Sequence, residues 1–193
     1  MKKAMALCSC AVLAAALSFS GCSKTKKAMS GMARDICGDK AVQTMMSDAW
    51  IEFNVRIMLA GPMGDLVRAM DEKKMSDDDI IKKMKQDMSR DMARDADKKI
   101  KFSSCATQAE TMKCDAAFKE IAGDKSNRMQ EALGKDAVKN LTDIAGKMNI
   151  KNCGVITVKA RADKKDEEET HKVYVGEING KVTSFFVSGM GGM

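Results

Sequence analysis

Residues 171–188 read HKVYVGEINGKVTSFFVS, and this stretch carries the strongest structural signal in the chain. Two runs rich in β-branched and aromatic residues flank the dipeptide Asn179-Gly180. Both central positions of a two-residue hairpin turn need positive φ, and Asn-Gly adopts that backbone conformation most readily. The stretch therefore predicts a β-hairpin that pairs His171–Ile178 with Val182–Ser188.

A further strand is expected just before this hairpin. Residues Val155–Ala162 alternate with period two, as in a half-buried strand. Four apolar side chains then share one face, namely Ile156, Val158, Ala160 and Ala162. The run DKKDEEE over 163–169 has the composition of a solvated loop. After residue 150 we therefore expect a three-stranded antiparallel sheet.

Before residue 150 the pattern is helical. Apolar residues recur three and four positions apart, which is the period of an amphipathic helix. Pro62 lacks the amide that a helix interior needs, so Gly61-Pro62 is expected to end one helix. Seven helices are expected here: one begins after Ser76, and the other six are Ala28–Ile36, Ala41–Ala60, Asp65–Lys74, Gln108–Ala122, Asn127–Leu133 and Asp136–Met148.

The clearest helix begins after Ser76, whose side chain can cap the free amides that follow it. Asp77–Asp79 lie where the helix dipole favours anions, and lysines at 98, 99 and 101 lie where its other end is expected. An apolar stripe follows one face of this helix at Ile81, Met84, Met88, Met92 and Ala96.

These elements predict a single α+β domain over residues 39–189. The chain has 193 residues, of which 45% are hydrophobic and 31% charged, and such a length suits one domain of ordinary size. Helices come first and the sheet last, so N-terminal helices are expected to pack on a C-terminal three-stranded antiparallel sheet. Residues 190–193 are expected to form a flexible tail.

The first 22 residues, MKKAMALCSCAVLAAALSFSGC, have the layout of a secretory signal. Lys2 and Lys3 form a positive start, residues 4–20 carry no charge, and small residues lead to Cys22. The segment FSGC at 19–22 resembles the lipobox of bacterial lipoproteins. An ordinary cleaved signal and an N-terminal anchor helix are the alternative interpretations.

The lipobox resemblance implies that residues 1–21 are removed as a signal peptide and that Cys22 is acylated, with palmitate or a similar chain. Two or more acyl chains anchor a protein stably to a lipid bilayer, whereas one chain does not. Residues 22–38 then form a lipidated tether and a first short helix. Ser23 implies sorting to the outer membrane of a double-membrane bacterium, with the protein facing the periplasm.

In element order and length the mature chain also resembles the NTF2-like and cystatin-like domains of small bacterial lipoproteins. In these domains, helices pack across a curved antiparallel sheet. Loss of Lys2 and Lys3 with the signal leaves 31 basic and 27 acidic side chains, with the two signs interleaved. No nucleic-acid partner is expected, because a concentrated basic face with stacking aromatic residues is not visible.

Four cysteines remain once Cys8 and Cys10 leave with the signal and Cys22 carries lipid. An even number in an oxidising compartment predicts two disulfides among Cys37, Cys105, Cys114 and Cys153. Three pairings are possible, and the sequence does not choose among them. A thiolate metal or redox site is the alternative, although no CxxC motif is present.

No residue stands out as catalytic, and no cofactor is predicted. His171 is the sole histidine and begins a predicted strand, so an HExxH zinc site is impossible and a surface or half-buried strand residue is the simpler interpretation. No G-x-S-x-G elbow accompanies it. The acidic runs at 77–79 and 166–169 are explained by helix capping and by a solvated loop.

Methionine is unusually abundant, with 18 residues in the chain. Met84, Met88 and Met92 are spaced four apart, and thioethers on one helix face could bind Cu(I). The same spacing builds an ordinary helix core, or a flexible partner-binding surface. Core packing is the favoured interpretation of the three.

The sequence therefore favours a membrane-anchored envelope lipoprotein that acts as a non-enzymatic binding module, with an envelope protein as one potential partner. The alternative is a metal-handling module, or an enzyme whose site is assembled only in three dimensions. A purely structural role in the envelope is a third hypothesis.

Overall fold

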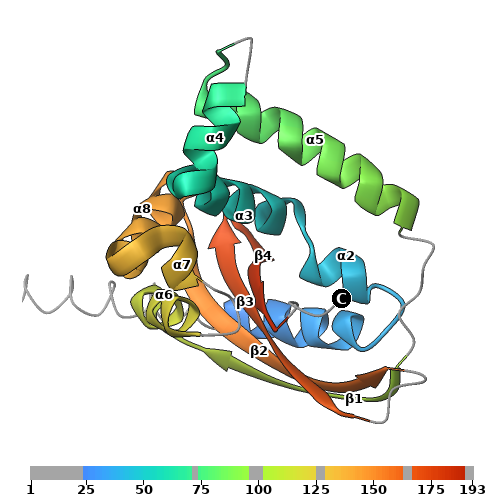
Figure 1. Cartoon of the computed structure of the whole chain (residues 1–193). Helices are drawn as coiled ribbons and strands as arrows, with labels where there is room; N and C mark the ends of the chain where they lie inside the picture. The colour runs from blue at the N-terminus through green and yellow to red at the C-terminus, as the bar shows by residue number, and fades with distance from the viewer. Residues whose placement is uncertain (1–23, 71–73, 96–101, 125–128, 163–166, 190–193) are drawn as a thin grey trace, which may run out of the picture.

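A computed structural model gives the fold and describes residues 24–70, 74–95, 102–124, 129–162 and 167–189. Residues 1–21, Cys22 and the tail at 190–193 lie outside the described residues, so the signal, anchor and tail remain predictions. Figure 1 shows helices on both sides of one curved antiparallel sheet. The α+β class, with helices first and the sheet towards the C-terminus, is confirmed.

The sheet has four strands, in the order β1-β2-β3-β4, and all neighbours are antiparallel. Their bounds are β1 (Phe102–Thr111), β2 (Lys151–Ala162), β3 (Glu169–Ile178) and β4 (Lys181–Ser188). The hairpin between β3 and β4 is confirmed, because Ile178 pairs with Lys181 and the turn residues Asn179 and Gly180 have φ values of 52° and 78°.

The prediction of three strands is wrong, because β1 precedes them and pairs with β2. Its last residues, 108–111, were expected to begin the helix Gln108–Ala122. In β1 the half-buried positions Cys105, Thr107 and Ala109 alternate with exposed ones, so the true period is two. The alternation is hard to recognise because the side chains are small. Hydrogen bonding to β2 stabilises this segment as a strand.

The helices begin with residues 24–36, which form an N-terminal helix. The other helices are α2 (Ala41–Met45), α3 (Asp48–Ala60), α4 (Pro62–Met70), α5 (Asp77–Asp95), α6 (Cys114–Gly123), α7 (Met129–Leu133) and α8 (Ala137–Lys147), with a short 3₁₀ turn, η2 (Gly134–Asp136), before α8. Pro62 is the first residue of α4, a position where its missing amide costs nothing.

The single helix expected over Ala41–Ala60 is wrong, because the chain breaks at Ser47 into α2 and α3. Ser47 caps α3 by accepting a hydrogen bond from the Trp50 amide at 3.2 Å. Its Oγ also donates to the backbone oxygen of Ser184 at 2.6 Å. The break therefore lets the α2–α3 connection cover β4, an edge strand of the sheet.

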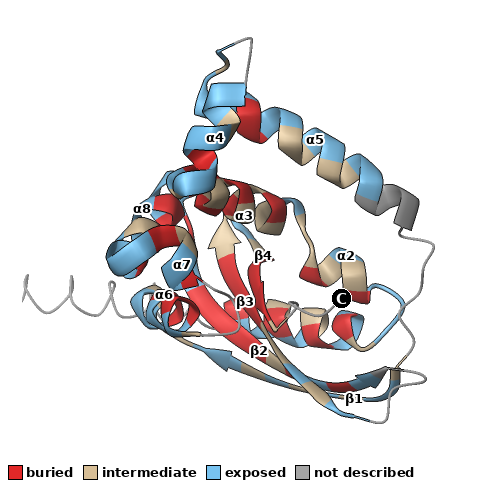
Figure 2. Ribbon diagram, in the orientation of Figure 1, coloured by how far each residue is buried: buried red, intermediate tan, exposed pale blue. Residues whose placement is uncertain are grey.

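Both faces of the sheet are buried, each under its own helices. On one face, α3, α6, α7 and α8 cover a cluster that includes Tyr174, Phe185 and Phe186. On the other face, the N-terminal helix and α2 cover Ile156, Val158 and Ala160, the face predicted for this strand. In Figure 2 the buried positions lie mainly in the middle of β2 and β3, in the second half of β4, and on the helix faces that meet them.

Candidate functional site

Helix α5 lies away from the sheet and packs on α3 (Figure 1). Ser76 caps it as predicted: its Oγ accepts the Asp79 amide at 3.2 Å and donates to the Asp79 carboxylate at 2.7 Å. Ile80 and Ile81 are buried against α3, and the rest of α5 has no buried side chain among those described. A mostly polar helix is therefore held to α3 by a narrow apolar stripe, buried at Ile80 and Ile81 and half-buried at Met84 and Met88.

Ion pairs add to that contact. Glu52 on α3 accepts hydrogen bonds from Arg56 at 3.0 Å and from Lys85 on α5 at 3.1 Å. Burial alone would raise the pKa of Glu52, but the hydrogen bonds from the two cations outweigh it and lower the pKa. Glu52 is therefore ionised at neutral pH and ties the middle of α5 to α3.

Arg68 on α4 holds the start of α5. Its Nε and Nη2 donate to the two carboxylate oxygens of Asp77 at 2.9 and 3.0 Å, a bidentate pair. These hydrogen bonds lower the pKa of Asp77. Arg68 also donates to the backbone oxygen of Leu59 at 3.0 Å, so one guanidinium joins α3, α4 and α5.

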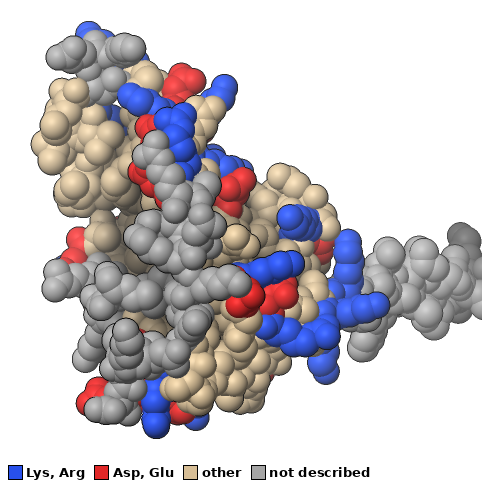
Figure 3. Space-filling view, turned by 90° about the vertical axis from the view of Figure 1, so that its right-hand side faces the viewer, with Lys and Arg blue, Asp and Glu red and all other residues tan. Residues whose placement is uncertain are grey.

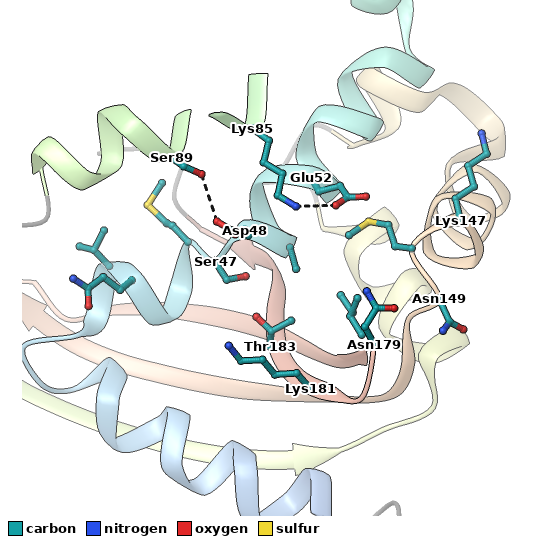
Figure 4. A pocket seen from close by; sticks show the side chains of 16 residues that line it. Ser47, Asp48, Glu52, Lys85, Ser89, Lys147, Asn149, Asn179, Lys181 and Thr183 are labelled. Atoms are coloured by element: carbon teal, nitrogen blue, oxygen red, sulfur yellow. Dashed lines mark hydrogen bonds and ion pairs between the residues drawn. The ribbon is translucent and has the colours of Figure 1, made fainter. Parts of the chain in front are cut away.

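A hollow of about 760 Å³, open to solvent, lies below α5, and we call it the α5 cleft. Figure 4 shows Lys85 directed to Glu52, and Ser89 to Asp48, across its upper side. Its floor is the β3–β4 turn and the end of α8. Its lining consists of Val42, Gln43, Met46, Ser47, Asp48, Ala49, Glu52, Lys85, Ser89, Lys147, Met148, Asn149, Ile178, Asn179, Lys181 and Thr183.

The cleft mixes hydrogen-bonding groups with apolar ones. Asn149 and Asn179 are exposed on its floor, both with left-handed backbone, at φ 54° and 52°. The side chains of Lys147 and Lys181 are exposed, and Lys147 acts electrostatically on Asp77. Such a lining can hold a polar ligand through side-chain amides and ammonium groups, with Met46 and Ile178 for its apolar parts.

The carboxylates of the cleft are poor candidates for proton transfer. Glu52 is bound by two cations, and its lowered pKa makes it a weaker base than an ordinary glutamate. Asp48 accepts a long hydrogen bond from Ser89 at 3.4 Å. The arrangement of the cleft is therefore better suited to binding than to acid–base chemistry.

Both disulfides join β1 or its end to another element. Cys37, just after the N-terminal helix, is bonded to Cys105 in β1, with Cα atoms 5.6 Å apart. Cys114, the first residue of α6, is bonded to Cys153 in β2, with Cα atoms 5.0 Å apart. Two disulfides were predicted and are confirmed, and the structure selects one of the three open pairings.

The predicted methionine stripe lies on α5. Met84 and Met88 are half-buried and pack against the apolar cluster between α3 and α5. Met92 is also in α5, but its side chain is outside the described residues. Among the residues that the structure describes, no group of three or more His, Cys, Asp or Glu side chains could hold a metal ion.

His171 is half-buried in β3, where its Nε2 lies 3.2 Å from a carboxylate oxygen of Glu169. Of the two acidic runs, Asp77–Asp79 occupies the first turn of α5 as predicted. Glu169 begins β3, whereas Asp166 lies outside the described residues. The structure brings neither run to the α5 cleft.

A second polar group lies on β3 and was not recognised in the sequence. Tyr174 donates a hydrogen bond to Glu120 of α6 at 3.1 Å, and Lys172 donates to the other Glu120 oxygen at 3.0 Å. Burial and the neighbouring carboxylate raise the pKa of Tyr174, so its hydroxyl remains a donor at physiological pH. This arrangement fixes α6 on the sheet.

No protein-family model, curated protein or solved structure matches the chain. Within the described residues, no helix has the length and apolar character needed to cross a bilayer. Functional inference therefore depends on the residues of this chain.

Proposed function

We propose that this protein is a membrane-anchored lipoprotein of the bacterial cell envelope, and that the α5 cleft is its binding site for a ligand or envelope partner. The observation that carries the binding role is the cleft itself, which has polar groups from five segments of the chain. One of its walls is α5, which buries only Ile80 and Ile81 among its described side chains. The proposed role is non-enzymatic binding, which is supported by Glu52, an ion-paired carboxylate whose pKa is lowered.

Two independent observations support a location in the cell envelope. Residues 1–22 have the layout of a lipoprotein signal, with Cys22 at the acylated position. Two disulfides, Cys37–Cys105 and Cys114–Cys153, are of the kind expected for a domain outside the reducing cytosol. Outer-membrane sorting, implied by Ser23, is part of the proposal.

The anchor is tested by intact mass measurement of the chain purified from its native membrane. We expect a chain that begins at Cys22 and carries acyl groups, and loss of the acyl groups in Cys22→Ala. The matched control is the double variant Cys8→Ala/Cys10→Ala, which we expect to be acylated normally because both residues leave with the signal. An unlipidated chain in the wild type would contradict the anchor.

The cleft is tested by site-specific photo-crosslinking in intact cells. A photoreactive side chain at Gln43, on the cleft wall, should capture a partner or ligand. The control has the same photoreactive side chain at Lys159, which is exposed on β2 outside the cleft. It should not capture the molecule that is captured at position 43. Adding Ala49→Trp fills the cleft and should abolish the adduct at position 43. An adduct that persists in this variant would contradict binding in the cleft.

We do not propose a copper site on the methionine stripe of α5 as an alternative to binding in the α5 cleft. Met84 and Met88 contact the apolar cluster formed by Ile51, Val55 and Leu59 with the start of α5, so their spacing is already explained by packing. Core packing therefore remains our interpretation of the stripe.

A further inference from the structure

The end of the sheet at which the chain enters the domain carries many lysines. In the antiparallel order, β1 and β3 end there and β2 and β4 begin there, as the pairs Thr111↔Gly154, Lys151↔Glu177 and Ile178↔Lys181 show. We call this the basic end. Its lysines come from three connections that are distant in sequence, β1–α6, α8–β2 and β3–β4, and from the start of the N-terminal helix.

Each of these connections presents an exposed ammonium group. Lys151 and Lys181 are the first residues of β2 and β4. Lys113 follows the end of β1, and Lys147 is the last residue of α8, just before β2. All four side chains are exposed.

The N-terminal helix begins at the same place. Lys24 donates from its Nζ to the backbone oxygen of Gly180, in the β3–β4 turn, at 3.2 Å. Lys26 and Lys27 follow within the same first helical turn and are exposed. Cys22 stands only two residues before Lys24, a reach of roughly 7 Å when fully extended.

Positive charge exceeds negative charge at this end. At the strand ends the described carboxylates are Glu110, Asp115 and Glu177, against seven lysines. Lys147 also lies near Asp77, which is paired with Arg68, and the α5 cleft adds Asp48 and Glu52, of which Glu52 is paired with Lys85. Glu177 is partly satisfied within the domain, because it accepts a hydrogen bond from Asn152 at 2.8 Å. Figure 3 shows acidic and basic side chains in mixed groups on one face, and a group of mainly basic side chains at the right-hand edge of the described part.

We infer that the basic end lies against the anionic phospholipid headgroups of the bilayer, so that the domain has a preferred orientation on the membrane. The inference rests on the proposed lipid anchor at Cys22, which would place this end next to the headgroups. Clustered lysines beside an anchor are attracted to an anionic lipid surface over about a Debye length. Lys147 and Lys181 also line the α5 cleft, so the cleft opens beside the membrane in this orientation.

The test measures vesicle binding of the unlipidated chain Ser23–Met193. This chain keeps every described helix and strand and both disulfides. Sedimentation is compared between vesicles of phosphatidylcholine alone and vesicles of phosphatidylcholine mixed equally with phosphatidylglycerol. We expect binding to the anionic vesicles only, and a steep loss of binding as sodium chloride is added.

Matched triple variants locate the surface. Lys113→Gln/Lys151→Gln/Lys181→Gln should weaken binding to anionic vesicles by roughly 10- to 100-fold. The control Lys40→Gln/Lys159→Gln/Arg161→Gln removes the same charge from exposed positions away from the basic end and should change binding less than about threefold. Circular dichroism and the unfolding midpoint establish that both variants fold.

Equal binding by the two variants, or equal binding to the two kinds of vesicle, would overturn the inference. Displacement by inorganic phosphate beyond that by sodium chloride at equal ionic strength would indicate a discrete phosphate site and would also overturn it. The anchor is judged separately from the mass of the native chain. An acylated Cys22 with no preference for anionic vesicles would leave the proposed function standing and reject the orientation.

Discussion

Strand β1 and helix α5 both lie at the edge of the domain, and neither contributes much to its core. β1 has no buried residue along its whole length, and α5 buries only Ile80 and Ile81 among its described side chains. They differ in how they are held. One disulfide attaches β1 at Cys105 and another attaches the chain just beyond its end at Cys114, whereas α5 is attached by non-covalent contacts: apolar packing, ion pairs and the Ser89–Asp48 hydrogen bond.

The difference suggests which part of the molecule moves. A disulfide restricts the unfolded chain and prevents an edge strand with few apolar contacts from separating. Ion pairs between partly exposed groups contribute little and break readily. We therefore expect β1 to stay in the sheet while α5, the wall of the α5 cleft, opens locally at modest cost in free energy.

The largest expected effect comes from removing the covalent attachment of β1. Cys37→Ala/Cys105→Ala deletes a cross-link between residues 68 apart, and the free energy of unfolding should fall by about 4 kcal/mol. Urea-induced unfolding gives this value. Cys114→Ala/Cys153→Ala removes a cross-link between residues only 39 apart, so the free energy of unfolding should fall slightly less. A loss under about 1 kcal/mol in both variants would show that β1 is held by pairing alone.

The next effect concerns the apolar contact of α5. Ile80 is 3% exposed, and Ile80→Ala should lower the free energy of α5 docking by about 2–4 kcal/mol. Hydrogen exchange should speed up in α5 and remain unchanged in β3. Lys83→Ala, at an exposed position in the same helix, is the control and should leave exchange in α5 nearly unchanged. Equal acceleration in α5 and β3 would mean that α5 unfolds only with the whole domain.

Parts of this comparison could be predicted from the sequence. Asn179-Gly180 indicated the hairpin, and Ser76 with Asp77–Asp79 indicated the start of α5, because turn and capping preferences act over a few residues. β1 was missed because Ser, Ala and Thr give almost no apolar alternation. The period of its half-buried positions is visible only once β2 is known to lie beside it.

The cleft could not be predicted at all. Its side chains come from α2, α3, α5, the end of α8 and the β3–β4 turn, and no local pattern relates these segments. The disulfide pairing was equally inaccessible, since it depends on β1 pairing with β2 and packing near the end of the N-terminal helix. The break at Ser47 was missed because its partner, Ser184, is 137 residues away.

A smaller effect concerns the ion pair of α5. The folded pKa of Glu52 is lowered, so its ionised form contributes stability above the ordinary pKa of 4.5, and that contribution is lost as the pH falls through the lowered value. We expect protection of α5 amides to weaken on acidification below about pH 4.5. Glu52→Gln should lower α5 protection at neutral pH by about 1 kcal/mol or less and remove part of the pH dependence. Glu168→Gln, at an exposed position before β3, should do neither.

The smallest expected effect tests the methionine stripe. Met84→Leu/Met88→Leu conserves apolar volume, so the free energy of unfolding should change by less than about 1.5 kcal/mol. The thermal unfolding midpoint is measured with and without Cu(I). Any shift that Cu(I) causes should be the same in the wild type and in the variant. A Cu(I)-dependent stabilisation present in wild type and lost in the variant would establish a metal site and contradict packing as the reason for the stripe.

The most direct test of the account is native-state hydrogen exchange of the oxidised mature chain, resolved by peptide. We predict that amides of α5 exchange through a local opening, with an opening free energy well below that of the sheet. Amides of β1 that pair with β2 should exchange slowly, together with β3, and should become fast only after the disulfides are reduced. Exchange of α5 at the same rate as β3, or fast exchange of β1 with its disulfides intact, would contradict a movable cleft wall beside a covalently held edge strand.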